Sequence, residues 1–431
     1  MSPGARSVGM GGGGMVFASG VDAVEWNPAN LSRSEGWNVS VIELGMATMS
    51  SGATFGEILA IVGVEDAPFL STDLTVGQIV NQIPDSGLQL FTVTEGFLTA
   101  FATGQAEVPQ AGSPLPSMGV TVGNIGLRVR SRVLGDATVS RGLADLIGNG
   151  FSVENLQEYE GGNTGWGTTS LSEITVSYGT MLGGLLHVGV GGRYIQGHGM
   201  TRGRFFEPQI ELAPGPGESY LTLQSVAVEA TSGKGFGIDV GLSLDLVPGL
   251  RASVSGTNVV QRMTWDEGLT AHSATFTDAD FAAGVDFVDI LDRYDASAVD
   301  PNSVSLAVFE ASQGLFDESY FPQVFRGGVG WRSGGTSFEL VGIKVSPKGR
   351  FRSNWDERVS LGVEQRLPVL TLRGGYAVGQ DNLTALTGGL GLGVGPVSLE
   401  VSGGKLSARG ATVSKQGYYA TLSLQLSGGG A

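Results

Sequence analysis

The chain has 431 residues, of which 71 are glycine and none is cysteine, and it carries a formal net charge of −16. The absence of cysteine excludes a disulfide scaffold and cysteine-ligated zinc, and the acidic balance argues against nucleic acid as a partner. A chain with 41% hydrophobic and only 15% charged residues is not expected to be disordered. No signal-peptide pattern precedes Gly11, and no stretch is typical of a membrane helix.

Residues 1–36 differ from the rest of the chain, because a glycine-rich run is followed by an Asn-Pro-Ala turn. The positions that form this motif are Gly4, Arg6, Gly9, Met10, Gly11, Gly12, Asp22, Ala23, Asn27, Pro28, Ala29 and Leu31. Glycine permits close backbone packing and positive φ, and Asn-Pro commonly begins a turn. Taken locally, the same residues also fit a short capped helix in front of the first strand.

The motif resembles the N-terminus of the fatty-acid transporter (FadL-like) superfamily of outer-membrane barrels, and it looks most like the PorV-type branch found alongside type IX secretion. Asn30 stands where the family usually has glycine. The resemblance implies that residues 1–36 fold inward as a hatch, or plug, inside a barrel formed by residues 37–427. It also implies fourteen strands, an even number like that of most single-chain bacterial barrels.

After a first strand predicted at Trp37–Met49, residues 52–112 lose the period of two. Thr72–Ile83 and Ser86–Phe101 have apolar residues at helical spacing instead. We interpret 52–112 as a helical insertion in a loop of the barrel, with additional plug as the alternative. A second helical or irregular insertion is predicted at 140–161.

Arginines alternate with apolar residues where the strands resume, at Arg128, Arg130 and Arg132. One face of a strand carries all three, and that face cannot contact lipid, because each arginine would cost roughly 2–4 kcal/mol at the midplane of a bilayer. Either they form structural ion pairs in the lumen or they bind an anionic head group such as a carboxylate. The residues predicted to line the lumen are Arg128, Arg130, Arg132, Arg193, Asp239, Asp245, Glu364, Arg366, Arg373 and Glu400.

Residues 266–316 are predicted to be a long acidic loop. Residues 266–300 contain nine aspartates and glutamates but only one lysine or arginine, Arg293. We expect a solvated loop on the outside of the cell. A calcium site is the alternative, because carboxylate-rich loops bind hard cations, although the spacing matches no EF-hand.

Five strands follow one another between Arg358 and Ser427 with very short turns, and they decide the fold class. Leucine, valine and tyrosine alternate there with polar residues, including Glu364 and Arg373 in mid-strand. Apolar residues on one face and charges on the other are typical of a barrel with lipid outside and water inside. The sequence therefore predicts an all-β protein, a single antiparallel transmembrane β-barrel of about fourteen strands with an N-terminal plug, small helical loop insertions and a short tail at 428–431.

Catalysis is not expected, because no convincing nucleophile–base pair or metal motif is present among the residues. His187, His198 and His272 are the only histidines, and no cofactor is predicted. The first hypothesis is an integral protein of the Gram-negative outer membrane that binds or passes hydrophobic small molecules, with the bilayer and a hydrophobic ligand or lipid as partners. The alternatives are a PorV-type barrel that binds a protein through its extracellular loops, in secretion or surface assembly, and a purely structural barrel.

Overall fold

The computed structural model describes residues 4–51, 88–93, 117–139, 165–205, 209–212, 219–277, 314–316, 323–346, 357–380, 383–408 and 415–428. Three short helices come first: α1 (Ala5–Gly9), α2 (Val21–Trp26) and the 3-10 helix η1 (Pro28–Arg33). The first nine strands are β1 (Trp37–Ser51), β2 (Leu88–Val93), β3 (Ser117–Val122), β4 (Ile125–Val139), β5 (Gly165–Leu182), β6 (Leu186–Phe205), β7 (Gln209–Leu212), β8 (Ser219–Ala230) and β9 (Ser232–Val247). The other nine are β10 (Leu250–Glu267), β11 (Thr270–Thr277), β12 (Gln323–Ser333), β13 (Thr336–Ser346), β14 (Glu357–Arg366), β15 (Leu370–Gly379), β16 (Leu383–Val394), β17 (Val397–Ala408) and β18 (Lys415–Gly428).

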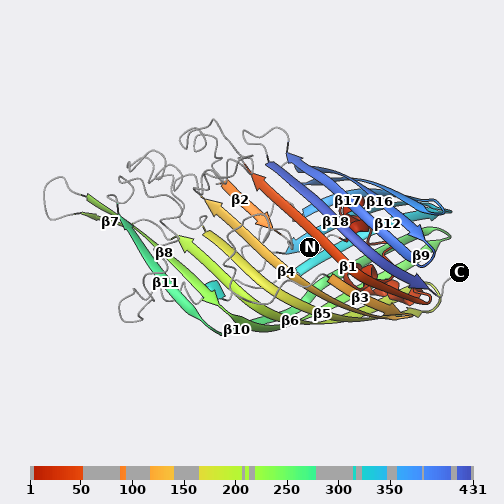
Figure 1. The fold of residues 1–431 in the computed structure, drawn as a ribbon, viewed down its shortest axis with the longest axis horizontal. Helices are drawn as coiled ribbons and strands as arrows, with labels where there is room; N and C mark the ends of the chain where they lie inside the picture. Colours follow the sequence, from red (N-terminus) through yellow and green to blue (C-terminus); the bar gives the residue numbers. More distant parts are fainter. Residues whose placement is uncertain are drawn as a thin grey trace.

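The strands form one antiparallel sheet that closes on itself, because β1 pairs along its length with the last strand, β18 (Figure 1). Four places in the barrel wall are each filled by two segments. β2 and β3 both lie between β1 and β4, while β6 is continued by β7, β9 by β8 and β10 by β11. The eighteen segments therefore make a barrel of fourteen strands, as predicted.

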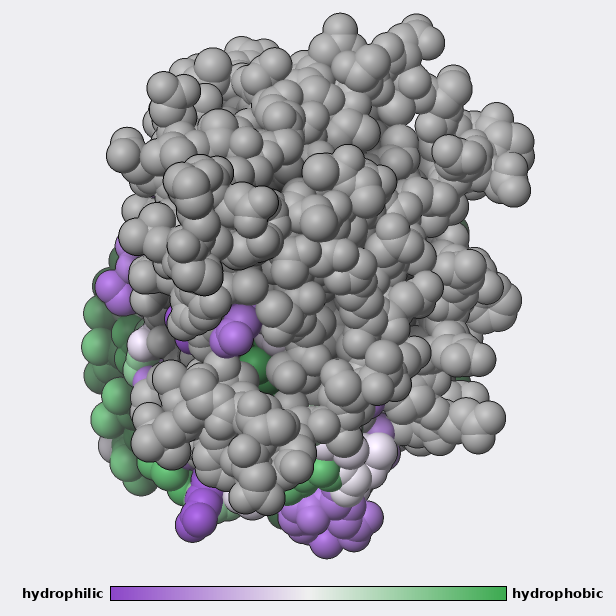
Figure 2. Space-filling view, turned by 90° about the vertical axis from the view of Figure 1, so that its left-hand side faces the viewer, coloured by the Kyte–Doolittle hydropathy of each residue, from purple (hydrophilic) through white to green (hydrophobic). Residues whose placement is uncertain are grey.

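Each strand separates an outer apolar face from an inner polar face. In β14, Val359 and Leu361 point outward and are 53% and 49% exposed. Ser360 and Glu364 point inward and are fully buried. The outward residues of β9 and β16 are likewise large and apolar. Figure 2 shows hydrophobic residues along the margin of the outer wall where described residues are in view. This is the distribution of a barrel that contacts lipid with its outer surface.

The two halves of the barrel wall differ in height. The strands β5, β6 and β10 are 18 to 20 residues long, whereas β12 to β17 are 10 to 12 residues long. We call β4 to β11 the tall wall and β12 to β17 the short wall. The turns Gly123–Asn124, Pro248–Gly249, Gly334–Gly335 and Gly395–Pro396 join strands at one end of the barrel, the turn end. At the opposite, far end, the tall wall extends beyond the short wall (Figure 1).

Two sequence predictions need correction. Within the predicted helical insertion 52–112, residues Leu88–Val93 form strand β2 rather than a helix, because they pair with β1 and β4 and so complete the wall. The acidic segment 266–316 begins as a strand, since β10 reaches Glu267 and β11 ends only at Thr277. Apart from the helical turn at 314–316, the rest of that loop lies outside the described residues, as does the insertion at 140–161.

The five C-terminal strands are confirmed as β14 to β18, with the short turns where the sequence placed them. Gly428, predicted to begin the tail, still belongs to β18 and pairs with Trp37. Within the described ranges, no helix is both long and apolar enough to cross a membrane.

Candidate functional site

The N-terminal segment, residues 4–33, lies inside the barrel between the two walls. Its first helix, α1, packs against β15 to β18, and its last helix, η1, packs against β5, β6 and β9. Almost all of its residues are buried, including charged residues such as Arg6 and Glu25. The motif found in the sequence therefore joins opposite sides of the barrel interior.

Arg6 fixes the segment to the short wall. Its guanidinium donates to Glu339 Oε1 at 2.7 Å, to Glu364 Oε2 at 3.0 Å and to the carbonyl oxygen of Gly14. Glu339 Oε2 also accepts from the Val16 amide at 2.8 Å, which holds the chain between residues 6 and 16 as a compact loop. Burial lowers the pKa of Arg6, but the two carboxylates outweigh this and hold it above its usual value.

Further charges extend this ion-pair group along the inner face of the short wall. Arg373 donates to Glu364 at 2.8 Å and to Glu400 at 2.7 Å, and Arg366 donates to Glu364 at 2.9 Å. Glu364 and Arg373 are buried, whereas the Arg366 side chain is 46% exposed at the turn end. These four predicted lumen residues thus form one network, with Arg366 at its margin.

Glycines allow the segment to approach the barrel wall closely. Gly11 has φ of +71°, and its amide donates to Thr387 Oγ1 at 2.9 Å. A Cβ on Gly375 of β15 would lie 2.0 Å from the Gly11 amide nitrogen, and one on Gly189 of β6 would lie 2.2 Å from that of Ala29. Side chains at these positions would displace the segment, so the glycines of the motif have partners in the glycines of the wall.

Glu25 fixes the other end of the segment, to the tall wall. Arg128 Nη1 lies 3.0 Å from Glu25, and Arg130 makes a shorter contact with the same carboxylate. Burial raises the pKa of Glu25, but Arg130 and Arg128 outweigh this and lower it to about 2. The carboxylate of Glu25 is therefore charged at neutral pH.

The other predicted lumen residues of the tall wall continue this ion-pair belt. Arg130 and Arg132 donate to Glu173 at 2.6 and 2.9 Å, and Arg193 bridges Glu173 and Asp239 at 2.8 and 2.7 Å. The three arginines of β4 thus bind carboxylates of the protein itself, which favours the structural alternative over an anion site. Sequence analysis missed Glu25, Glu173 and Glu339. The alternation of Glu339 with the outward Phe338 and Leu340 could have indicated an inward carboxylate.

Asparagines and a serine complete the attachment of η1. Asn27 accepts from the Ala29 amide at 3.1 Å, as a helix cap does, and donates to Ser243 Oγ at 3.0 Å. Asn30 accepts from Ser243 Oγ at 2.9 Å and donates to the Met15 carbonyl at 3.0 Å. Asn30, the departure from the family pattern, therefore links η1 to β9 and to the preceding loop.

Ser32, His187 and Asp245 lie in a row that resembles a hydrolase triad. Ser32 Oγ is 2.5 Å from His187 Nδ1, and His187 Nε2 is 3.4 Å from Asp245 Oδ2. However, Ser32 Oγ donates to the Ala29 carbonyl at 2.6 Å, so Nδ1 must be the donor towards Ser32 and cannot remove its proton. Asp245 also accepts from Arg33 and Arg251, both at 2.8 Å. The row anchors η1 and gives no grounds for catalysis.

An apolar cluster occupies the interior of the tall wall towards the far end. Leu171 and Ile195 lie two residues beyond Glu173 and Arg193 on the same inward faces of β5 and β6. The members of this lumen cluster are Leu171, Ile195, Met200, Val226, Val228, Ala230, Met263, Trp265 and Leu315. All are at most 6% exposed. The ion-pair belt therefore lies directly next to a large group of buried apolar side chains inside the barrel.

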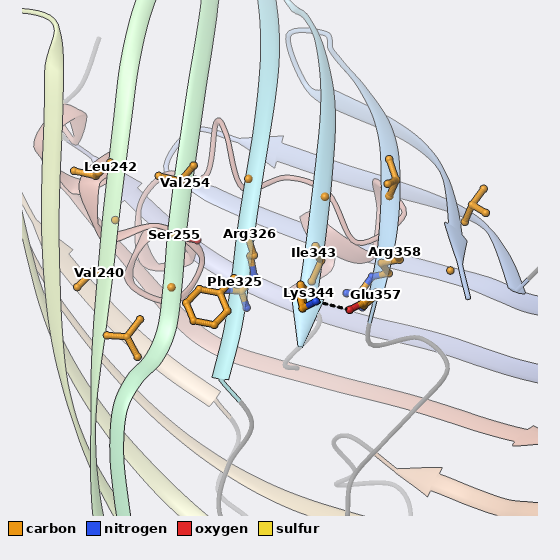
Figure 3. A pocket seen from close by; sticks show the side chains of 18 of the residues that line it. Val240, Leu242, Val254, Ser255, Phe325, Arg326, Ile343, Lys344, Glu357 and Arg358 are labelled. Carbon is orange, nitrogen blue, oxygen red and sulfur yellow. Dashed lines mark ion pairs between the residues drawn. The ribbon is translucent and has the colours of Figure 1, made fainter. Parts of the chain in front are cut away.

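A groove of about 820 Å³ crosses the wall where the two halves of the barrel meet (Figure 3). The pairing of β10 with β12 ends at Thr257 and Val324, while β10 continues along β9 after a bulge near Asn258, which has φ of 55°. Gly327 of β12 pairs with Gly342 of β13. Because neither residue has a side chain, the outer face of the wall has a depression at this pair. Small residues thus form the floor of the groove, and the groove lies beside the point at which the hydrogen bonding between β10 and β12 ends.

A second cavity, of about 500 Å³, opens at the turn end and is mainly polar. Its lining includes Arg6, Asp22, Arg366, Arg373 and Glu400. Burial raises the pKa of Asp22 to about 6, although Arg128 acts in the opposite direction. Among the described residues, no group of histidines and acidic residues could hold a metal ion. The aspartates proposed as an alternative calcium site lie mostly outside those residues.

No protein-family model and no curated protein matches the sequence. Solved structures do match over the full length. The toluene transporter TbuX of Ralstonia pickettii is 16% identical with a TM-score of 0.51, and 98% of each chain is covered. The chain has the fold of a FadL-like barrel. Two further structures have the same fold. A FadL homologue of Pseudomonas aeruginosa is 10% identical with a TM-score of 0.50, and 99% of this chain and 98% of that chain are covered. A TodX deltaS2S3 mutant monoaromatic hydrocarbon channel is 11% identical with a TM-score of 0.51, and 98% of each chain is covered.

The predicted FadL-like architecture is therefore confirmed. These structural relatives give no support to the alternative of a protein-secretion partner.

Proposed function

We propose that this FadL-like barrel passes hydrophobic small molecules across the outer membrane. The location is supported by an even number of antiparallel strands, tight turns at one end and an outward apolar surface, which together are the features of outer-membrane barrels. The solved structures with the same fold include a toluene transporter and a mutant of a monoaromatic hydrocarbon channel. Hydrophobic molecules of this size are the class we propose for this protein.

The observation that carries the proposal is the apolar lumen cluster. A barrel that serves only polar solutes has a polar, water-filled interior. Here Met200, Met263 and Trp265 are buried on inward faces, above the ion-pair belt of Glu173 and Arg193. A large apolar lining with a few polar groups at its edge is the usual composition of a small-molecule site.

The N-terminal segment is proposed to act as the plug of this route. It lies between the lumen cluster and the polar cavity at the turn end, and buried ion pairs hold it to both walls. A molecule that moves from the cluster to the turn end must therefore displace or bypass residues 4–33. The plug would keep polar solutes from leaking through the lumen.

Uptake of radiolabelled toluene by cells that express the full chain tests the proposal. Trp265→Ala removes the largest aromatic of the lumen cluster and should reduce the uptake rate several-fold. Trp331→Ala is the matched control, because Trp331 is outward, 44% exposed and stacked on Phe338. Uptake that equals that of cells without the protein would refute the proposed passage, and equal uptake by the two variants would remove the cluster from the route. A gel shift on heating, which reports a closed barrel, checks that each variant folds.

A further inference from the structure

Arg326 of β12 is a buried cation without a carboxylate partner among the described residues. It is 5% exposed and lines the wall groove. Its Nη1 donates to Thr257 Oγ1 at 2.7 Å, its guanidinium lies 4.8 Å from the centre of the Trp26 ring, and its Nε has no hydrogen-bond partner. A buried charge normally has an opposite charge next to it, because its desolvation is costly. Arg326 therefore marks a place where an anion would be stabilised.

The nearest acidic side chains do not fill this role. Glu25 and Asp239 act on Arg326 only at long range. Glu25 is already bound by Arg128 and Arg130, and Asp239 by Arg193. Both carboxylates are therefore already engaged by other buried arginines.

Two further cationic side chains, Arg358 and Lys344, lie near Arg326. Arg326 pairs with Ile343, and Ile343 with Arg358, so the two inward arginines lie two strands, or roughly 10 Å, apart. At the rim, Lys344 Nζ contacts Glu357 at 2.8 Å, and both side chains are largely exposed. The charged residues of the groove are thus three cations and one carboxylate.

The remainder of the groove is shaped for a hydrocarbon chain. The outward residues Val254, Phe325 and Val359 flank the low floor formed by Gly327 and Gly342. In Figure 3 the ring of Phe325 lies between β10 and β12, and Arg326, the next residue of β12, has its side chain on the opposite, inner face. This apolar part belongs to the outer face of the barrel, which contacts the bilayer. An amphiphile could thus place its hydrocarbon chain on the outer face of the barrel and its head group where the pairing of β10 with β12 ends.

We propose that the wall groove binds an anionic lipid of the surrounding bilayer. One acyl chain lies over Gly327 and Gly342, and the phosphate of the head group is bound by Arg326. Arginine suits this role because its fork of donors matches a phosphate oxygen pair, and basic pockets at a membrane surface bind anionic head groups. This site is separate from the lumen cluster and does not depend on passage of small molecules.

Native mass spectrometry of the full chain in a neutral detergent tests the site. The probes are dioleoylphosphatidylglycerol and dioleoylphosphatidylcholine, which have the same chains and differ in net charge. The anionic lipid should bind at least ten-fold more tightly than the zwitterionic one, which corresponds to about 1.4 kcal/mol. Arg326→Gln should abolish this preference. Arg262→Gln, which removes an exposed arginine of β10 outside the groove, should leave it unchanged.

A second pair of variants tests the proposed position of the acyl chain. A Cβ on Gly342 has its nearest neighbour at 3.8 Å, so Gly342→Leu fills the groove without a clash, and it should weaken both lipids about equally. Gly374→Leu, at an exposed glycine of β15 with open space around it, is the control.

Three outcomes would overturn the proposal: no preference for the anionic lipid, a preference that Arg326→Gln retains, or binding that Gly342→Leu leaves intact. Palmitate as a third probe distinguishes the source of the anion, because binding of palmitate without phosphatidylglycerol would assign the site to a free carboxylate and contradict a bilayer lipid. Toluene uptake by Arg326→Gln should stay normal, so failure here and failure of the proposed passage can be told apart.

Discussion

The short wall and the tall wall hold the same segment with opposite arrangements of charge. On the short wall the segment supplies the cation, Arg6, and the barrel supplies the carboxylates of Glu339 and Glu364. On the tall wall the segment supplies the carboxylate, Glu25, and the barrel supplies the arginines of β4. A segment turned end for end would place like charges together inside the barrel. The difference between the walls therefore specifies the orientation of the N-terminal segment.

The walls also differ in what else they line. Inside the short wall, the charged network around Glu364 lies beside apolar residues of β12 and β13 that pack against residues 15–18 and Trp26 of the segment. The tall wall adds the apolar lumen cluster beyond its ion-pair belt, and the described members of that cluster are residues of β5, β6, β8 and β10 and Leu315. We infer that the short wall mainly holds the segment and that the tall wall also receives the ligand. The predictions below test how separate these roles are.

The largest effect is expected at the short wall. Arg6→Ala leaves Glu339 and part of Glu364 uncompensated in the interior, which should destabilise the docked segment by about 3–5 kcal/mol. Hydrogen exchange of peptides within residues 4–33 measures this. Arg366→Ala is the control, since Arg366 contacts the same Glu364 but is 46% exposed, and should cost at most about 1 kcal/mol. Equal effects of the two substitutions would contradict the claim that the buried Arg6, and not the exposed Arg366, holds the segment to the short wall.

A smaller effect is expected where η1 meets the tall wall. Asn27→Ala removes a cap to the Ala29 amide and a hydrogen bond to Ser243, and should raise exchange in residues 27–33 by about 1–2 kcal/mol. Exchange near Arg6 should stay unchanged if the two ends are held independently. Asn124→Ala, in the exposed turn between β3 and β4, serves as the control. Equal loosening of both ends would show that the segment is held as a single unit.

The smallest effect concerns pH. Asp22 has a folded pKa of about 6, above its ordinary value of 3.8, so docking gains from its protonation. This contribution is fully present below about pH 3.8 and is lost as the pH rises through 6. Exchange around residues 19–26, corrected for its intrinsic pH dependence, should increase between pH 4.5 and 7.5, and Asp22→Asn should abolish the increase. An unchanged increase in the variant would assign the pH dependence to another group.

Glu25 provides an internal comparison for that experiment. Its pKa is lowered to about 2, from an ordinary value of 4.5, so its contribution is present above pH 4.5 and is lost only as the pH falls towards 2. The pairing of Glu25 with the tall wall should therefore stay constant over the range in which Asp22 titrates.

The sequence predicted the C-terminal strands of the short wall most clearly, for a physical reason. Strands such as β14 and β15 are lined by polar residues inside and lipid-facing residues outside, so a period of two is visible. In the tall wall the inward positions Met263 and Trp265 are as apolar as outward ones, which weakens the alternation. β2 was missed because Leu88–Val93 is recognisable mainly by its pairing with β1 and β4.

The candidate site was predicted only in part. The motif at 1–36 and the inward direction of the β4 arginines followed from spacing, but their carboxylate partners are distant in sequence, as Arg130 and Glu25 illustrate. Arg326 was overlooked because a single arginine between Phe325 and Gly327 looks like any lumen residue. Its lack of a carboxylate partner among the described residues is a property of the assembled barrel.

The central claim is that the N-terminal segment closes the lumen, and the conductance of the reconstituted barrel tests it most directly. The full chain and a variant that lacks residues 4–33 are inserted into planar bilayers, and heat-dependent gel migration confirms that both are closed barrels. The account predicts near-baseline ion conductance for the full chain and stable open-channel currents, on the order of ten-fold larger or more, for the deletion. Equal conductance of the two intact barrels would contradict it.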